Sequence, residues 1–236
     1  IFTDVKGVYT TDPNLIKNAK KIKIISYEEM LEMASLGAKV MQPASIQEAR
    51  LNRIEIDVRS TFSKMSGTLI TKKKDILSKN TIRGISFTKN DAKLTLIGVK
   101  DKPGIAASIF KPLYENSINV DMVVQNVSAG GRETDLTFTI KLEDLKKTRK
   151  LVENNRYIKF RKLIVNKNVS KVSIVGVGMV TTPGVTFRMF RALAKKKINI
   201  EVISTSEIKI SVLINKKNLK KSVEILHQEF KLNNSL

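Results

Sequence analysis

The pattern of hydrophobic and polar positions occurs twice along the chain. Residues 94–125 read as an apolar strand, a tight turn, an amphipathic helix and a second strand, and residues 172–205 repeat that order. The two copies align at one constant offset without a gap, which indicates an internal repeat. The matched positions are Gly98 and Gly178, Pro103 and Pro183, Gly104 and Gly184, Phe110 and Phe190, Leu113 and Leu193, Ile118 and Ile198, Asn119 and Asn199, and Asp121 and Glu201.

Within the first copy, the apolar strand stops at a turn that contains Pro103 and Gly104. The fixed φ of proline suits the first helical position, so we expect the helix to start there. The glycine leaves room for a ligand near the free N–H groups of the helix start, where the dipole favours a carboxylate. The next strand opens at Ile118, and its alternation places Asn119 and Asp121 at the same end of the unit as the turn.

The second copy has no strand after its last helix that could complete a sheet. We therefore expect residues 81–88, an apolar strand that precedes the first copy, to cross over and complete the sheet of the second. The other predicted elements are strands at 133–140, 158–165 and 209–214 and helices at 142–154 and 219–230.

Residues 1–72 form a first block, and the polar segment 73–80 links it to the repeats. Ser26 and Glu29 are spaced as a capping box in front of an apolar helix, which Gly37 is placed to end. The block also contains a strand end at Ile1 and Phe2, a turn-rich loop from Thr3 to Pro13, a helix opened by Pro43 and a strand at 54–58.

Length and composition change this picture only slightly. The 236 residues are enough for two or three domains with real cores. The absence of cysteine fits a reducing cytoplasm, and no apolar run approaches the roughly 20 residues of a membrane span, so we expect a soluble, cytoplasmic protein. The chain begins at Ile1 in the middle of a strand pattern, so we expect that a preceding part is missing.

The formal net charge of +21 is the one feature that suggests a nucleic acid partner. The lysines are scattered, however, and a general residue bias explains them equally well. The densest runs, at 72–74, 146–150 and 195–197, have no interleaved aromatic residue for base stacking, so we interpret them as solvated faces. We expect neither a nucleic acid nor a membrane partner.

The repeat resembles an ACT domain, a small regulatory module that binds amino acids. The resemblance is carried by the strand, D-x-P-G, the helix and I-N-V-D, and it is sharpened by Q-N-V-S at 125–128 and by I-S-T-S-E-I-K-I-S at 203–211. Together the two copies look like the paired ACT domains of aspartokinases, which phosphorylate the side-chain carboxylate of aspartate.

The first block is similar to the C-terminal, nucleotide-binding part of the amino-acid kinase domain in the same family. The similar segments are T-D-V-x-G-V-Y-T-T-D-P, S-Y-E-E-M-L-E-M-A-S-L-G-A-K-V, V-R-S-T-F-S and G-T-x-I. The fold class that this implies is α/β: a partial amino-acid kinase α/β sandwich followed by two ferredoxin-like βαββαβ ACT domains. We expect the kinase part at 1–72, the linker at 73–80, and ACT domains at 81–166 and 167–236, the latter completed by strand 81–88.

The resemblance implies ATP-dependent phosphorylation of L-aspartate at the entry to lysine, threonine and methionine biosynthesis, with feedback regulation. ATP, with Mg²⁺ as its counter-ion, would lie among the residues that match the nucleotide-binding positions of the family. The amine of Lys39 would reach the ATP as a flexible point charge. From the residues alone, Asp4 and Asp12 are equally explained as turn formers, and Lys39 as a charge that favours the helix dipole. The implied ATP-binding positions are Thr3, Asp4, Tyr9, Thr10, Thr11, Asp12, Pro13 and Lys39.

Three positions depart from the pattern of the family. Asn14 and Ala44 stand where arginine is expected, and Lys6 stands where an acidic residue is usual. The glycine-rich catalytic motif, the aspartate-binding carboxylate and the basic group for phosphoryl transfer have no counterpart in the sequence. Because phosphoryl transfer depends on positioned charge, we expect no catalytic residue in this chain and no turnover by the chain alone.

The effector would bind where two ACT units set their helix starts toward a shared cleft, in one chain or across a homodimer. The resemblance implies lysine or threonine, with the carboxylate on N–H groups near Gly104 or Ile105 and the ammonium near Asp101 or Asp121. Thr181 replaces Asp101 in the second copy, so we expect unequal binding. The implied effector positions are Asp101, Lys102, Pro103, Gly104, Ile105, Ala106, Asn119, Val120, Asp121, Gln125, Val185, Thr186, Asn199, Ile200, Ser206 and Glu207.

Several alternatives stay open at this point. Asp101 is equally well interpreted as a helix cap, and His227, which has no obvious partner, as a structural or solvated residue. The chain is interpreted first as an aspartokinase chain. It could otherwise be a regulatory subunit or amino-acid sensor that pairs with a separate kinase chain, or, in a different class, a nucleic acid binder.

Overall fold

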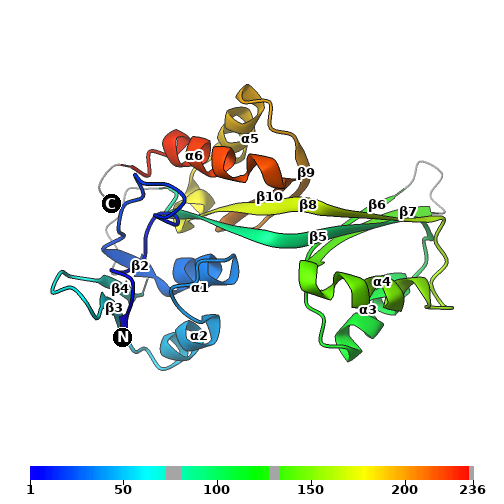
Figure 1. The fold of residues 1–236 in the computed structure, drawn as a ribbon, viewed down its shortest axis with the longest axis horizontal. Coiled ribbons are helices and arrows are strands. Elements are labelled where there is room, and N and C mark those ends of the chain that lie inside the picture. The colour runs from blue at the N-terminus through cyan, green and yellow to red at the C-terminus, as the bar shows by residue number, and fades with distance from the viewer. Residues whose placement is uncertain (73–80, 128–132, 234–236) are drawn as a thin grey trace. The chain divides into compact units, whose positions relative to one another are not determined.

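The computed structural model describes residues 1–72, 81–127 and 133–233. The predicted linker at 73–80 and Ser128 of the Q-N-V-S segment lie outside this part. The chain forms two compact units, one made of residues 1–88 together with 171–236 and the other of residues 89–170. The kinase-like block and the second repeat therefore share one unit, which Figure 1 shows in blue and in yellow to red.

A four-stranded sheet and two helices form the N-terminal block. The strand order is β1-β3-β4-β2, with β1 parallel to β3, β2 parallel to β4, and β3 antiparallel to β4. The elements are β1 (Phe2–Thr3), β2 (Ile24–Ser26), α1 (Tyr27–Ser35), α2 (Pro43–Leu51), β3 (Ile56–Ser60) and β4 (Thr68–Thr71).

The helix boundaries in this block follow the predicted local signals. The Ser26 hydroxyl accepts the Glu29 N–H at 3.1 Å, and the Glu29 carboxylate accepts the Ser26 N–H, which completes the capping box. Gly37 follows the end of α1 with a φ of 114°, and Pro43 is the first residue of α2. The strand predicted at 54–58 is shifted to Ile56–Ser60.

The first repeat lies in the unit of residues 89–170. β7 pairs antiparallel with β5 on one side and with β6 on the other, and the helices cover a core that includes Leu94, Ile109 and Phe138. The elements are β5 (Gly84–Lys100), α3 (Ile105–Glu115), β6 (Val120–Val127), β7 (Glu133–Lys141), a 3₁₀ turn (Leu142–Asp144), α4 (Leu145–Glu153) and β8 (Lys162–Val175).

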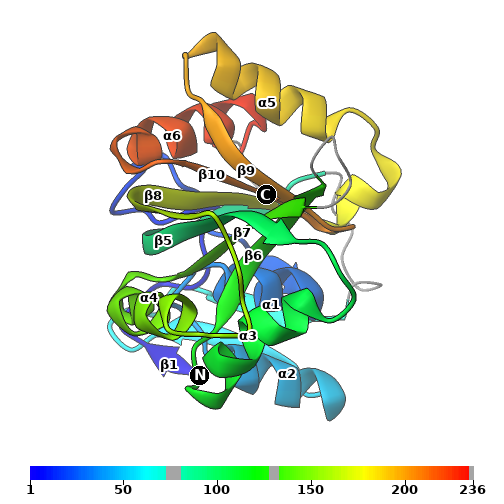
Figure 2. The same ribbon diagram turned by 90° about the vertical axis from the view of Figure 1, so that its right-hand side faces the viewer.

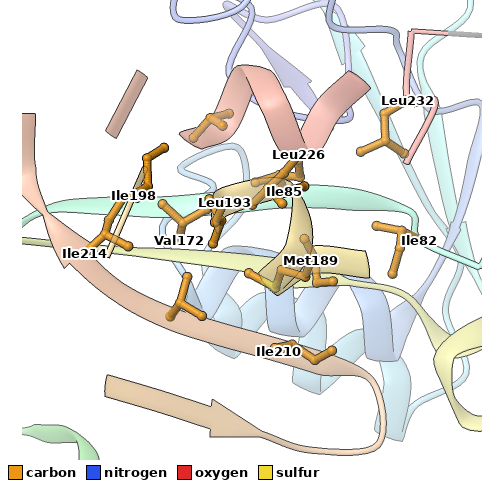
Figure 3. Close-up of a cluster of buried hydrophobic side chains, with 14 of the residues drawn as sticks. Ile82, Ile85, Val172, Met189, Leu193, Ile198, Ile210, Ile214, Leu226 and Leu232 are labelled. Carbon is orange, nitrogen blue, oxygen red and sulfur yellow. The ribbon is translucent and has the colours of Figure 1, made fainter. Parts of the chain in front are cut away.

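The second repeat follows the same order in the unit with the kinase-like block. Figure 3 shows its core, in which Ile82 and Ile85 from the start of the β5 segment lie with Val172 of β8. The Arg83 N–H donates to the Val175 carbonyl at 2.7 Å, and β10 pairs antiparallel with β9. The elements are a 3₁₀ helix (Val177–Thr181), α5 (Val185–Lys195), β9 (Ile200–Thr205), β10 (Lys209–Asn215), a 3₁₀ turn (Lys216–Asn218) and α6 (Leu219–Glu229).

In this unit a strand layer separates two cores. Figures 1 and 2 show α5 and α6 on one side of the strands and α1 on the other. Successive residues of β8 face opposite sides, because Ile174 belongs to the core under α5 and α6 whereas Val175 belongs to the core around α1. The end of β8 is thus in contact with the kinase-like block and with the second repeat.

The two repeats agree in backbone detail as well as in order. α3 and α5 have eleven residues each, and both begin after a left-handed glycine, Gly104 or Gly184, with a φ of 85°. Ser117 and Lys197, just beyond the helix ends, have φ values of 57° and 58°. The repeat deduced from the sequence is therefore a repeat of structure.

Two predictions about the turns and strands were wrong. Pro103 does not occupy the first helical position, because Gly104 is the N-cap and α3 begins at Ile105. A Cβ on Gly104 would meet nothing within 4 Å, so the positive φ, rather than lack of space, requires glycine. The separate strands predicted at 81–88 and at the start of the first repeat are one continuous strand, β5.

Candidate functional site

The turn of the first repeat is an open surface that precedes α3. Asp101 to Gly104 are exposed, whereas the Ile105 side chain is buried in the core. The Ile105 N–H donates to the Lys102 carbonyl at 3.2 Å, so the amide expected to bind a carboxylate is already engaged. Helix geometry leaves the N–H groups of the next two residues, Ala106 and Ala107, available to a ligand.

The other predicted effector positions of the first repeat lie on β6 or, for Asn119, just before it. Asn119, Asp121 and Gln125 are exposed, and Met122 between them is buried. A hollow of about 490 Å³ adjoins this strand and brings Asn119 and Val120 together, whereas the turn residues 101–106 do not line it. Its lining is Phe110, Leu113, Tyr114, Ser117, Ile118, Asn119, Val120 and Val123.

The matching surface of the second repeat differs from the first. Val185 is buried, which leaves only its backbone for a ligand, and Thr181, in place of Asp101, directs its hydroxyl to the Gly178 carbonyl at 3.4 Å. The Ser206 N–H donates to the Lys209 carbonyl at 2.9 Å. Of the remaining predicted positions, Thr186, Asn199, Ser206 and Glu207 have exposed side chains and Ile200 is half-buried.

The predicted ATP-binding loop is partly a structural loop. Asp12 accepts the Asn14 N–H at 2.8 Å, as a turn-forming aspartate does, and Thr3 accepts the Val5 N–H at 2.9 Å. Tyr9 forms an isolated antiparallel bridge with Lys21. The positions with exposed side chains are Asp4, Pro13 and Lys39.

Thr10 has buried partners that occupy its polar groups. Its hydroxyl accepts the Lys20 N–H at 3.0 Å and lies 2.9 Å from Nε2 of His227, and its carbonyl accepts the Ile85 N–H at 2.7 Å. Burial lowers the pKa of His227 below its usual value. Thr10 therefore joins the loop to α6 and β5, and the hydroxyl of Thr11 is also buried, without a hydrogen-bond partner among the described residues.

Sequence reasoning missed two features of the kinase-like block. A hollow of about 540 Å³ lies beside β1 and β3, and its lining includes Phe2, Arg59 and the exposed Phe62. The segment V-R-S-T-F-S was the available signal for it. Glu29 was the other omission, because its carboxylate reaches Arg83 at 3.3 Å and the Val177 N–H at 3.1 Å, both far away in the sequence.

Two kinds of feature are absent from the described part of the chain. It contains no group of three or more histidine and acidic side chains that could hold a metal ion. No helix in the same residues is long and apolar enough to cross a membrane.

Comparisons with known proteins agree with this architecture. Residues 94–155 and 172–230 match the ACT domain, and residues 1–60 match the amino acid kinase family. The chain is 46% identical, over 98% of its length, to an aspartate kinase of Pseudomonas putida, and spans 57% of that relative.

Solved structures give the same result. Aspartokinase III of E. coli in complex with aspartate and ADP has a TM-score of 0.82 and 27% identity, with 97% of this chain and 51% of that chain covered. The ligand-free regulatory subunit of aspartate kinase from Thermus thermophilus has a TM-score of 0.60 and 37% identity, with 64% of this chain and 99% of that chain covered.

Two ACT domains beside an amino acid kinase segment define a class of chains that combines these two folds. Within that class, the chain belongs to the aspartokinase family. It spans a little more than half the length of the curated aspartokinases that it matches. The α/β fold class, with a partial kinase sandwich and two ACT domains, is confirmed.

Proposed function

We propose that this chain functions as part of an aspartokinase. This enzyme transfers phosphate from ATP to L-aspartate at the entry to lysine, threonine and methionine biosynthesis, and it is feedback-regulated. The observation that carries the proposal is the pair of repeats with equal turns at Gly104 and Gly184, joined to a kinase-like block. We propose ACT domains at 81–166 and 167–236 and a kinase part at 1–72. The packing of Ile82 and Ile85 in the core of the second repeat supports strand 81–88 as its completing strand.

For the nucleotide, the exposed positions Asp4, Pro13 and Lys39 are the best candidates for direct contact, with Tyr9 and Asp12 beside them. Thr3, Thr10 and Thr11 would shape the loop. The crystal structure of the E. coli relative contains ADP, which supports nucleotide binding in this family. Because Mg²⁺ is held mainly by phosphates, waters and one or two carboxylates, the single aspartates of the loop fit it as a counter-ion.

Equilibrium binding of MgATP tests the nucleotide proposal. Lys39→Ala should weaken binding by roughly tenfold to a hundredfold, because one charge-assisted contact to phosphate is worth about 1.5–3 kcal/mol. Lys23→Ala, which removes another exposed lysine of the same block, is the matched control. Equal affinity of the two variants would contradict the role of Lys39.

A turnover assay with ATP and aspartate tests the second part of the proposal. The sequence does not contain the glycine-rich motif or the basic group that phosphoryl transfer requires. We therefore propose that these 236 residues do not catalyse phosphoryl transfer by themselves. Phosphate transfer by the purified chain would contradict this.

For the effector, we propose lysine or threonine at the first repeat. The carboxylate would bind the N–H groups of Ala106 and Ala107, and the ammonium would bind near Asp101, with Asn119, Asp121 and Gln125 as further polar groups. Another structure of the E. coli relative contains lysine, which supports this class of ligand. Coupling to the kinase would require a differential affinity of roughly 1–3 kcal/mol.

Thermal unfolding with and without each amino acid tests the effector site. A ligand at a hundredfold excess over its Kd stabilises the folded chain by about 2.7 kcal/mol, so lysine or threonine should raise the Tm. Asp101→Asn should abolish the shift and Asp144→Asn, on a different element of the same unit, should preserve it. An equal shift in both variants would remove Asp101 from the site.

We also propose that the ACT domains mediate assembly, as a homodimer or with a kinase subunit. Tyr114, which is 83% exposed, and Val123 present an apolar surface beside the hollow on the first repeat. The Thermus thermophilus relative is a separate regulatory subunit, which supports assembly of this kind. Light scattering should report a dimer that Tyr114→Ser weakens; a monomer at all concentrations would contradict the homodimer.

A further inference from the structure

The carboxylate of Glu29 does more than cap α1. Its side chain is 1% exposed. Oε2 accepts Nε of Arg83 at 3.3 Å as well as the Ser26 N–H, and Oε1 accepts the Val177 N–H at 3.1 Å. One buried charge therefore joins the start of α1, the residue before β5 and the first residue of the 3₁₀ helix Val177–Thr181.

A capping box does not require this arrangement. A neutral glutamine serves equally at the third helical position, so capping alone does not explain a buried charge. Arg83 is also buried, at 4% exposure, and taking two charges out of water usually offsets most of their attraction. The pair is therefore a poor device for stability, whereas its directed hydrogen bonds fix the position of the Val177–Thr181 helix against α1.

The rest of α1 is held against the same strand layer. The Ser86 hydroxyl donates to the Met33 carbonyl at 3.1 Å, and Lys209 pairs with Glu32 at 3.0 Å. At the end of the helix, a Cβ on Gly37 would lie 2.3 Å from the Phe87 carbonyl. Because packed helices move as units, a shift at the first turn of α1 would be transmitted to its last turn.

The two ends of this connection are the turn of the second repeat and the proposed nucleotide site. The 3₁₀ helix Val177–Thr181 precedes Gly184 and α5, at the position that carries Asp101 in the first repeat. At the other end, α1 ends at Ser35, four residues before Lys39. All of these residues lie in the unit of 1–88 and 171–236.

We infer that Glu29 is a positioning residue that couples the turn Val177–Thr181 of the second repeat to α1 and, through α1, to the nucleotide-binding lysine. The regulatory role of this coupling rests on the proposed function. Its mechanical part, that the Glu29 to Val177 hydrogen bond holds the turn and α1 together, holds without any ligand.

One substitution in the backbone removes this hydrogen bond. Val177→Pro deletes the donor N–H, and its ring takes the place of the hydrogen that points at Glu29. The backbone suits proline, because Val177 is the first residue of its 3₁₀ helix and Gly176 is extended, with φ 173° and ψ 130°. Val177→Ala keeps the N–H and removes a similar part of the side chain, so it is the matched control. If circular dichroism shows that the proline variant is unfolded, Glu29→Ala, which removes the acceptor of the Val177 N–H, replaces it.

Hydrogen exchange of the ligand-free full chain, measured by mass spectrometry, is the test. We expect exchange in α1 and in residues 177–181 to be about tenfold faster in Val177→Pro than in Val177→Ala, as for the loss of one hydrogen bond to a charged group. Exchange in α6 and in α4 should not change. Equal exchange of α1 in the two variants would overturn the inference, and so would a uniform rise across α5, α6 and β10, because that is general destabilisation.

A second arm separates this inference from the proposed function. Saturating lysine or threonine should alter exchange in α1 of the wild-type chain and of Val177→Ala, and this response should be lost in Val177→Pro. A response of α1 that persists in Val177→Pro would overturn the coupling role. If neither amino acid changes exchange anywhere in the wild type, the proposed effector function fails, while the ligand-free comparison still decides the mechanical role of Glu29.

Discussion

Nε2 of His227 lies 2.9 Å from the hydroxyl oxygen of Thr10, although 217 residues separate them in the sequence. The contact is buried, and it joins the last helix of the second repeat to the loop that resembles the ATP-binding loop of aspartokinases. Like the ion pair of Glu29 and Arg83, it lies within the compact unit that the kinase-like block and the second repeat share.

His227 should make the stability of the chain depend on pH. Because burial lowers its folded pKa below the ordinary value of 6.5, the unfolded chain binds the proton more readily, and stability falls as the pH drops through that value.

Urea unfolding between about pH 7.5 and 5.5 measures this effect. His227→Gln keeps a polar partner for Thr10 and removes the titration, so its free energy of unfolding should decrease less steeply over the same range. Parallel pH profiles for the wild type and the variant would show that another group is responsible.

The turn glycines should respond alike to substitution. Gly104→Ala and Gly184→Ala should each destabilise the chain by about 1–2 kcal/mol, because an L residue is strained at a φ of 85° although the space around the Cβ is open. Asparagine, which tolerates this region, should cost less at both positions. Chemical denaturation of the four variants measures this, and a neutral alanine would mean that the turn adopts another conformation.

We expect Thr68 to contribute strongly to the stability of the kinase-like block. Its hydroxyl accepts the buried Val8 N–H at 2.8 Å and donates to the Ile22 carbonyl at 2.6 Å. Thr68→Val should cost about 1–3 kcal/mol, since it leaves a buried donor without a partner. Thr68→Ser, which keeps the hydroxyl, should cost less, and the account fails if the two variants unfold at the same urea concentration.

Local signals in the sequence predicted the parts of the fold that depend on neighbouring residues. Ser26 and Glu29 are three positions apart, so their capping box could be recognised, and the spacing of Gly104 and Gly184 revealed the repeat. The prediction that Pro103 is the first helical residue was wrong, because proline suits both that position and the turn before it. Only the observed helix start distinguishes the two.

Long-range contacts could not be predicted from these signals. Glu29 reaches partners that are 54 and 148 residues away, and nothing in a capping-box pattern indicates a second role for its acid. The Ile105 amide was expected to be free, but a turn hydrogen bond to Lys102 engages it. Thr10 matched a nucleotide-binding motif, whereas its burial against His227 shows that the position also holds the fold together.

Calorimetric titration of lysine and of threonine into the folded chain tests the central claim most directly. The account predicts saturable binding of at least one of them at a single site per chain, because the first repeat carries Asp101 and the second carries Thr181 in its place. No binding heat for either amino acid, or two equal sites per chain, would contradict it.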